Sequence, residues 1–185
     1  MKPQRAKNHW SAIKKSLDTF DRTGLLMLLA DLYRANAENR RFLESRLLSE
    51  TGTIEKYRRA LVEAIYPVPM SRRPINLKGA SATITQYRRA TGDPVGTTDL
   101  MLSFVEAGTE QSVDLGYGDD GYFAALERKL DAIAAVFDDL PPNDQAKALG
   151  RLSRVRGRAQ NIGWGYGDYV ADVVRRIERR ATNAK

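Results

Sequence analysis

The most regular pattern in the chain is Gly121-Tyr122-Phe123-Ala124-Ala125-Leu126-Glu127-Arg128-Lys129-Leu130-Asp131-Ala132-Ile133-Ala134-Ala135-Val136-Phe137-Asp138-Asp139-Leu140. Its large apolar side chains recur every three or four residues, which is the spacing of one face of an α-helix. That face carries Phe123, Leu126, Leu130, Ile133, Phe137 and Leu140. Residues 121–140 are therefore predicted to form the strongest helix of the chain.

The same periodicity continues in both directions from this segment. Upstream it predicts helices over 8–17, from 21 or 23 through 32, around 42–47, over 51–65, over 77–91, and from 94 to a stop at Gly108. Downstream it predicts one helix from the prolines at 141–142 to residue 162, and a last helix that follows residue 168. No window alternates with period two. The prediction is an all-α fold, an antiparallel array of about eight or nine short helices, either helical-repeat-like or an irregular bundle.

A length of 185 residues suits one domain with a core of its own. The one marked break in helical character is the segment 66–76, in which Pro67, Pro69 and Pro74 remove backbone donors and favour extended neighbours. We therefore expect a single helical domain over 1–185, with the Pro-rich loop 66–76 as the place where it would subdivide.

Composition excludes several kinds of chemistry. The chain has no cysteine, which excludes disulfides, zinc ribbons, iron–sulfur clusters and thiol nucleophiles. The single histidine, His9, excludes a histidine-rich metal site. Carboxylates are the remaining catalytic candidates, and paired aspartates lie on protein surfaces more often than in sites. A non-enzymatic protein without metal or cofactor is predicted, and the alternative is a metal-dependent enzyme that uses Asp119, Asp168 or Asp172.

Charge is distributed unevenly along the chain. Residues 1–92 hold 18 Lys/Arg and 8 Asp/Glu, residues 93–140 hold 2 and 11, and residues 141–185 hold 10 and 4. An acidic middle thus separates two basic ends. Basic segments favour a polyanion partner. The alternatives are solvated faces and pairing of the acidic block with a basic block, in the same fold or in a second copy.

A basic stripe lies on the helix predicted to end at residue 162. Lys147, Arg151, Arg154 and Arg158 share one face, opposite the apolar side chains, and Arg156 lies beside them. The planar fork of arginine suits phosphate and carboxylate groups. The stripe is therefore a candidate nucleic-acid-binding face, and pairing with the acidic block or plain solvation are the alternatives.

Two segments of the first half resemble each other. Residues 53–60, Thr-Ile-Glu-Lys-Tyr-Arg-Arg-Ala, match residues 83–90, Thr-Ile-Thr-Gln-Tyr-Arg-Arg-Ala, at six of eight positions. The 30-residue offset is close to the period of stacked helical hairpins, although two amphipathic helices can also agree by chance. Each segment contains two consecutive arginines. If the segments stack as repeats, these arginines form one ridge that can follow a phosphate backbone: Arg58, Arg59, Arg88 and Arg89.

The tetrapeptide Gly-Tyr-Gly-Asp occurs at 116–119 and again at 165–168, each time before an apolar helix. A P-loop would also need Lys-Ser/Thr at the helix start, which neither copy has. A glycine-rich turn with the aspartate as N-cap is the favoured interpretation. The aromatic residues Trp164 and Tyr166 of the second copy could stack on a ligand, but packing at the end of the array is preferred.

Several segments resemble an uncharacterised bacterial all-helical family, known as domain of unknown function 6155. The resemblance lies in Leu29-Ala30-Asp31-Leu32-Tyr33-Arg34-Ala35-Asn36, in Arg41-Phe42-Leu43, in the segments 99–108 and 117–119, and in Ile162-Gly163-Trp164-Gly165-Tyr166-Gly167-Asp168. Membership would imply an all-helical fold. It implies no activity and no site residues, and the arginine-rich 147–158 helix is not a feature of the family.

Together these features predict a non-enzymatic binding protein whose arginine-rich helix faces contact nucleic acid or a nucleoprotein complex, mostly at phosphates. The alternative is a protein-interaction subunit of a homo- or hetero-oligomer that uses the acidic middle and the basic ends. The longest apolar run, residues 25–30, is far shorter than the ~20 residues that span a bilayer. No signal peptide is recognised, so we expect a cytoplasmic protein without a membrane partner.

Overall fold

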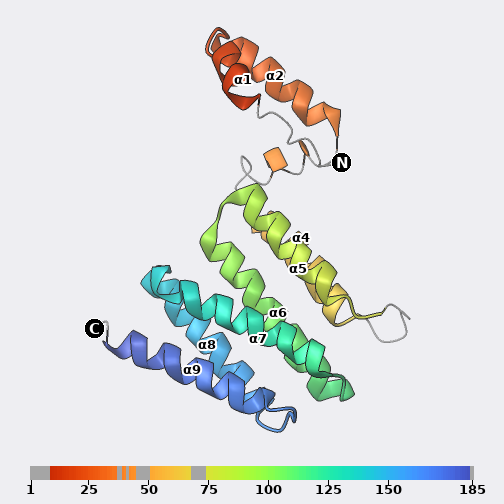
Figure 1. Ribbon diagram of the computed structural model, residues 1–185, viewed down its shortest axis with the longest axis vertical. Helices are drawn as coiled ribbons and strands as arrows, with labels where there is room; N and C mark the ends of the chain where they lie inside the picture. Colours follow the sequence, from red (N-terminus) through yellow and green to blue (C-terminus); the bar gives the residue numbers. More distant parts are fainter. Residues whose placement is uncertain (1–8, 37–38, 41, 45–50, 68–73, 184–185) are drawn as a thin grey trace, which may run out of the picture. The chain divides into compact units, whose positions relative to one another are not determined.

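The computed structural model describes residues 9–36, 39–40, 42–44, 51–67 and 74–183 (Figure 1). All regular structure in these residues is helical, and they contain no strand. The helices are α1 (Trp10–Leu17), α2 (Arg22–Ala35), α4 (Thr51–Ile65), α5 (Leu77–Thr91), α6 (Pro94–Leu115), α7 (Asp120–Val136), a 3₁₀ turn (Phe137–Asp139), α8 (Pro142–Ala159) and α9 (Tyr166–Asn183). The predicted all-α class is confirmed.

The chain divides into two compact units, unit 1 (Met1–Leu48) and unit 2 (Ser49–Lys185). The sequence predicts a single domain over 1–185, with the Pro-rich loop 66–76 as its candidate point of subdivision. The division into units lies before α4 instead. That loop joins α4 to α5, which pack against each other within unit 2. Residues 68–73 of the loop lie outside the described residues.

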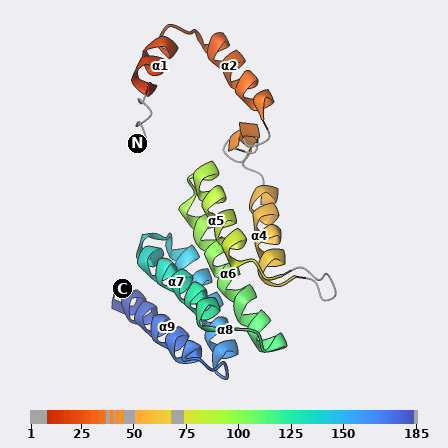
Figure 2. The ribbon, with the colours of Figure 1, turned by 45° about the vertical axis from the view of Figure 1, so that its right-hand side comes forward.

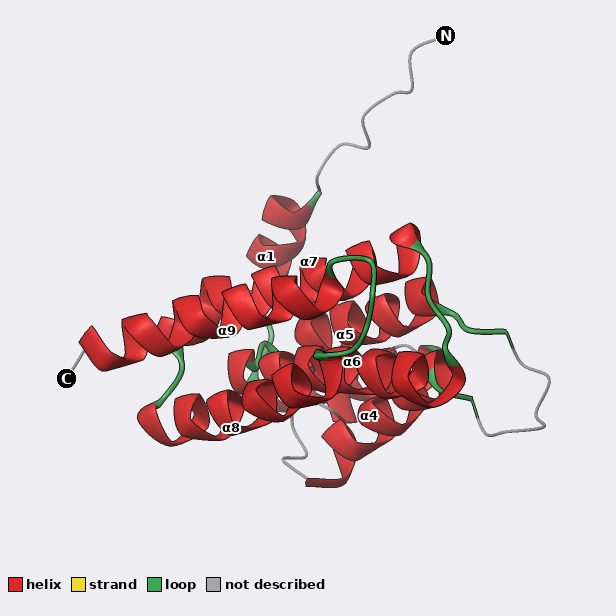
Figure 3. Ribbon diagram, turned by 90° about the horizontal axis from the view of Figure 1, so that it is seen from below, coloured by secondary structure: helices red, strands yellow, loops and turns green. Residues whose placement is uncertain are grey.

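Unit 2 is built around α6. This helix packs against α4, α5, α7 and α8, and α9 closes the bundle by packing on both α7 and α8. Figure 3 shows α6 running between α7 and α8. Fourteen of its 22 residues are buried, many of them small. The hydroxyls of Thr97, Thr98, Ser103 and Thr109 bond back to carbonyls one turn earlier, so their burial leaves no polar group unpaired.

The predicted end of this helix at Gly108 is wrong, because α6 continues to Leu115. Gly108 is buried inside the helix, and the hydroxyl of Tyr122 donates to its carbonyl at 2.8 Å. A Cβ at this position would lie 2.3 Å from Cδ2 of Leu126. The glycine thus lets α7 approach α6 closely and does not break the helix. The true end comes at Gly116, whose φ of 62° is left-handed.

The segment 121–140 forms the predicted helix and supplies much of the core. Phe123, Leu126, Leu130 and Ile133 on α7 are buried, and so is Phe137 in the 3₁₀ turn that follows. The carboxylate of Asp119 accepts from the backbone N–H of Tyr122, so it caps α7 as the Gly-Tyr-Gly-Asp motif had suggested. One continuous apolar cluster joins these residues to α4, α5, α6, α8 and α9.

The similar segments 53–60 and 83–90 lie side by side in α4 and α5, which run antiparallel (Figure 2). The rings of Tyr57 and Tyr87 meet edge to face with centroids 5.3 Å apart. The two segments are therefore the facing halves of one hairpin. Stacked repeats of the kind considered from the 30-residue offset would place both copies in the same direction, and α4 and α5 do not.

We predict that Gly108→Ala lowers the free energy of unfolding by about 1–3 kcal/mol, because the added methyl group meets the fully buried Leu126. Gly150→Ala is the matched control. Gly150 also lies inside a helix, but a Cβ there meets nothing within 4 Å. This substitution should stabilise by about 0.5–1 kcal/mol through helix propensity alone. Urea denaturation measures both, and equal effects would contradict the close approach of α6 and α7.

Candidate interaction surfaces

The arginine stripe of α8 faces the carboxylates of α6. Arg151 is the centre of this network: its Nε donates to Glu106 at 2.8 Å, and one Nη reaches Asp99 at 2.5 Å. Its other Nη donates to the hydroxyl of Ser103 at 2.9 Å. Asp99 also pairs with Arg58 of α4. A single carboxylate on α6 therefore joins α4 to α8.

Other cations of the stripe are paired as well. Arg158 holds Glu110 at 2.6 Å and Asp114 at 3.4 Å. Arg156 holds Glu178 of α9 at 3.1 Å, and Lys147 holds Asp144 at 3.0 Å. Arg154 is exposed and, among the described residues, has no carboxylate partner.

The acidic block therefore pairs with the basic block inside unit 2, which was one of the alternatives that the sequence left open. Arg151 is mostly shielded, with 18% of its side chain exposed. The phosphates of a nucleic acid would have to displace carboxylates that already occupy these guanidinium groups. Nucleic-acid binding through Lys147, Arg151, Arg154, Arg156 and Arg158 stays a prediction, with Arg154 the one cation of the five that needs no displacement.

The four arginines of α4 and α5 do not act as one group. Arg58 pairs with Glu55 and Asp99, whereas Arg59, Arg88 and Arg89 are exposed. None of these three has an ion pair in the part of the chain that the structure describes. The ridge expected from stacked repeats required α4 and α5 to run in the same direction, which they do not. Nucleic-acid binding through Arg58, Arg59, Arg88 and Arg89 stays a prediction.

Lys129 of α7 is partly buried against α6. Its Nζ lies 5.4 Å from the ring centroid of Phe104, which is a buried residue of α6. Partial burial lowers the pKa of Lys129, and the charges of Arg128 and Arg88 lower it further.

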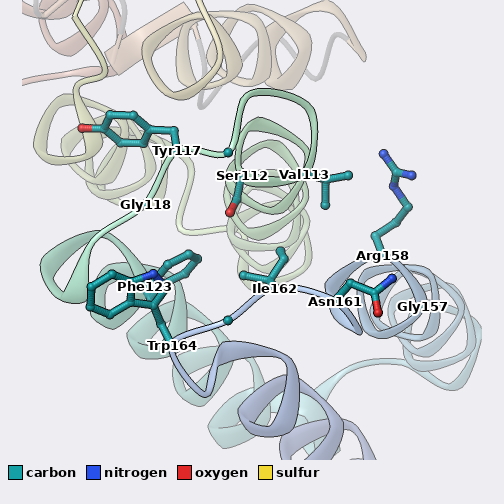
Figure 4. A pocket seen from close by; sticks show the side chains of 12 residues that line it. Ser112, Val113, Tyr117, Gly118, Phe123, Gly157, Arg158, Asn161, Ile162 and Trp164 are labelled. Carbon is teal, nitrogen blue, oxygen red and sulfur yellow. The ribbon is translucent and has the colours of Figure 1, made fainter.

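The first Gly-Tyr-Gly-Asp motif lines a cleft at the end of the bundle, and the loop that precedes the second motif, residues 161–164, lines it too. The cleft has a volume of about 390 Å³, and both loops line it, together with the last turns of α6 and α8. Figure 4 shows Trp164 and Phe123 on one side and Arg158 and Asn161 on the other. Gly116 and Gly165 open the motifs with φ of 62° and 73°. The left-handed φ of Gly116 ends α6, whereas that of Gly165 belongs to the loop directly before α9.

The aromatic residues of the second motif have different roles. Tyr166 is fully buried: its hydroxyl lies 2.8 Å from that of Thr109, and its ring is 5.1 Å from that of Phe123. It packs the core, as preferred from the sequence, and cannot stack on a ligand. Trp164 is 66% exposed and has a φ of 63°. It is the aromatic residue of the motif that a ligand can reach.

The candidate catalytic carboxylates do not gather. Asp119 caps α7, Asp168 lies in the first turn of α9, and Asp172 pairs with Arg175 on the same helix. No group of three or more His, Cys, Asp or Glu among the described residues could hold a metal ion. No helix in the described ranges is long and apolar enough to cross a membrane.

Unit 1 presents an apolar surface that sequence reasoning missed. None of the residues of α1 or α2 is buried. On α2, six large apolar residues are each more than a third exposed: Leu25, Leu26, Met27, Leu28, Leu29 and Leu32. We call them the α2 apolar surface. Four of these residues, Leu25, Leu28, Leu29 and Leu32, share one side of the helix, and Leu26 and Met27 extend the surface beyond that side. Asp31 and Arg34, which pair with each other, lie away from it.

Comparisons with family models, with curated proteins and with solved structures find no match to this chain. The resemblance to the uncharacterised bacterial family therefore stays an expectation, and the candidate surfaces rest on geometry alone.

We predict that Arg151→Met lowers the free energy of unfolding by about 2 kcal/mol, because it leaves Glu106 without its cation. The loss is smaller than for a fully buried pair, since 31% of the Glu106 side chain is exposed and is screened by water. Arg154→Met on the exposed side of the same helix should change stability by less than about 0.5 kcal/mol. Chemical denaturation of both variants tests this, and similar losses would argue against the network.

We also predict a loss of stability above about pH 10, because burial raises the pKa of Tyr166 above its ordinary value of 10.0. A raised folded-state pKa contributes stability that is complete below the unfolded pKa and is lost as pH rises. Tyr166→Phe removes one such group while Thr109 keeps its bond to Val105. The fall in unfolding free energy above pH 10 should therefore be shallower by up to about 1.4 kcal/mol per pH unit. Urea titrations at several alkaline pH values measure the slope, and an unchanged slope would contradict the assignment.

Proposed function

We propose that the protein is a non-enzymatic interaction protein, and that the α2 apolar surface binds a partner protein. The observation that carries this proposal is the contrast between the two units. Unit 2 has a continuous buried core, whereas α1 and α2 bury no residue at all. The apolar face of a helix normally packs against another element, and exposed apolar patches of this kind mark interaction sites.

The charge of unit 1 favours an acidic partner. Residues 1–48 hold 10 Lys/Arg and 5 Asp/Glu, a net charge of +5. Its exposed cations include Lys14 and Lys15 of α1 and Arg22 of α2. A second copy of unit 1 would bring a like charge of +5 against it, which disfavours self-pairing. The partner that fits has an apolar groove bordered by carboxylates.

The distribution of apolar residues favours a protein groove over a lipid surface. A helix that lies on a membrane immerses one face and keeps the opposite face polar. Leu26 and Met27 lie away from the side that carries Leu25, Leu28, Leu29 and Leu32, and they are among the most exposed apolar residues of α2. Enclosure by a groove covers all of them, which a flat lipid surface does not.

Nucleic-acid binding by the α8 stripe is the less supported function, because carboxylates of unit 2 already occupy most of its cations. Pairing of the acidic middle with the basic end of another copy is weakened for the same reason. The sequence-based alternative, a protein-interaction subunit, agrees with this proposal in the kind of function. It differs in the surface, because the proposal uses α2 and not the acidic middle and the basic ends.

The test uses Trp10 as a reporter, since Trp10 and Trp164 are the two tryptophans of the chain. In the full-length Trp164→Phe protein, we expect a designed helical peptide of leucine and glutamate to shift Trp10 emission to shorter wavelength and to saturate. The same peptide with lysine in place of glutamate should bind at least about tenfold more weakly, because it places like charges against unit 1.

Two variants make the test specific to α2. Leu25→Asn with Leu29→Asn should abolish the emission shift, whereas Leu115→Asn, at a more exposed leucine of unit 2, should leave it unchanged. An equal response to both peptides would refute the acidic partner. Concentration-dependent self-association without peptide would assign the surface to a second copy, and a shift with phosphatidylserine vesicles alone would assign it to lipid. Either result would overturn the proposal.

A further inference from the structure

The exposed apolar side chains of unit 2 gather at the cleft at the end of the bundle. Among the described residues of this unit, the large apolar side chains that are more than a third exposed are Val113, Leu115, Tyr117 and Trp164. Three of these four line the cleft (Figure 4). Its volume of about 390 Å³ is within the range of small-molecule sites. The apolar surface of unit 2 is therefore concentrated where a small ligand can be enclosed.

Ser112 of α6 supplies an unused hydrogen-bonding group inside this cleft. The residue is only 8% exposed, and Figure 4 shows its hydroxyl pointing into the cleft on the side of Ile162. The four other buried hydroxyls of α6 each bond to a carbonyl one turn earlier, whereas no hydrogen bond within the described ranges uses that of Ser112. The carbonyl one turn before it, that of Gly108, accepts from Tyr122. A mostly buried hydroxyl normally has a partner, and a ligand in the cleft can provide one.

The electrostatics of the cleft favour a positively charged ligand. Both α6 and α8 end at the cleft, so the negative ends of two helix dipoles and their last carbonyl groups lie on this side of the bundle. Arg158 is the one charged residue among those that line the cleft, and it is already held by Glu110 and Asp114. One positive and two negative groups leave an excess of negative charge. An anion would have to displace these carboxylates, whereas a cation would not.

Aromatic rings on the rim of the cleft offer faces to such a cation. Trp164 is 66% exposed, and its φ of 63° is a strained conformation for a residue other than glycine. The ring of Tyr117 is held edge to face against that of Tyr122, with centroids 5.2 Å apart, and is itself exposed. The faces of aromatic rings attract cations, and tryptophan attracts them most strongly.

We propose that the cleft at the end of the bundle binds a small organic cation. The charged nitrogen of the ligand lies against the rings of Trp164 and Tyr117, at the ends of α6 and α8, and a polar group of the same ligand bonds to Ser112. A neutral aromatic compound would make no use of the negative charge at the cleft, and a phosphate compound would find no free cation there. The site belongs to unit 2 alone and is independent of the α2 apolar surface.

The test compares choline with its neutral carbon analogue, in which a tert-butyl group replaces the trimethylammonium group. The two compounds share their shape and their hydroxyl, so they differ in charge alone. The full-length Trp10→Phe protein keeps Trp164 as its one tryptophan, and a saturable change of its emission therefore measures binding at the cleft. We expect choline to bind with a dissociation constant in the millimolar range or below. The neutral analogue should bind about tenfold more weakly, because it lacks the cation–π attraction.

Two glycines of α8 provide a matched pair of variants. A Cβ at Gly157 or at Gly150 meets nothing within 4 Å, so a larger side chain fits at either position, but only Gly157 lines this cleft. Gly157→Leu should fill the cleft and weaken choline binding by about tenfold or more, whereas Gly150→Leu should weaken it less than about twofold.

Three results would overturn the proposal. Choline could leave the emission of Trp164 without a saturable change, or the neutral analogue could bind as tightly as choline does. The third is an equal loss of binding in the Gly157→Leu and Gly150→Leu proteins, which would place the ligand outside the cleft.

Discussion

Neutralisation of the carboxylates on α6 is the constraint on which unit 2 depends. The helix buries fourteen residues, yet it also carries Asp99, Glu106 and Glu110. A carboxylate in such surroundings needs a cation. Arg58 and Arg151 meet at Asp99, so the same ion pairs that satisfy α6 also hold α4 and α8 against it. The arrangement of α4, α6 and α8 therefore has to satisfy apolar packing and the pairing of charges at the same time.

The pairing of arginines with carboxylates inside unit 2 determines which surfaces remain available to a partner. In the sequence, the cations of α8 form a stripe that predicts nucleic-acid binding. In the structure, most of them are counter-ions of carboxylates within unit 2. The leucines of α2 remain exposed, and among the described residues Arg59, Arg89 and Arg154 hold no carboxylate. Unit 2 provides a helical body with a continuous core, and unit 1 provides apolar helices in which no residue is buried.

Glycine illustrates how local sequence can mislead. Gly108 reads as a helix stop, yet it lies inside α6 because Leu126 of α7 needs the space that a side chain would fill. Gly116 and Gly165 are predicted to lie in turns, and both adopt the left-handed φ that glycine favours there. The similar segments 53–60 and 83–90 suggested a stacked repeat. The contact between Tyr57 and Tyr87 shows that they face each other in one hairpin. In each case the deciding contact comes from another helix.

The sequence by itself determined the helical class, the burial of the 121–140 face and the N-cap at Asp119, because periodicity and capping act within one or two helical turns. It also showed the opposite charges of the acidic middle and the basic end. Only the tertiary structure decided that Arg151 and Arg158 pair with α6, that Tyr166 is core, and that Lys129 lies over the ring of Phe104. Those outcomes depend on which helices pack side by side, and the packing joins residues more than forty positions apart.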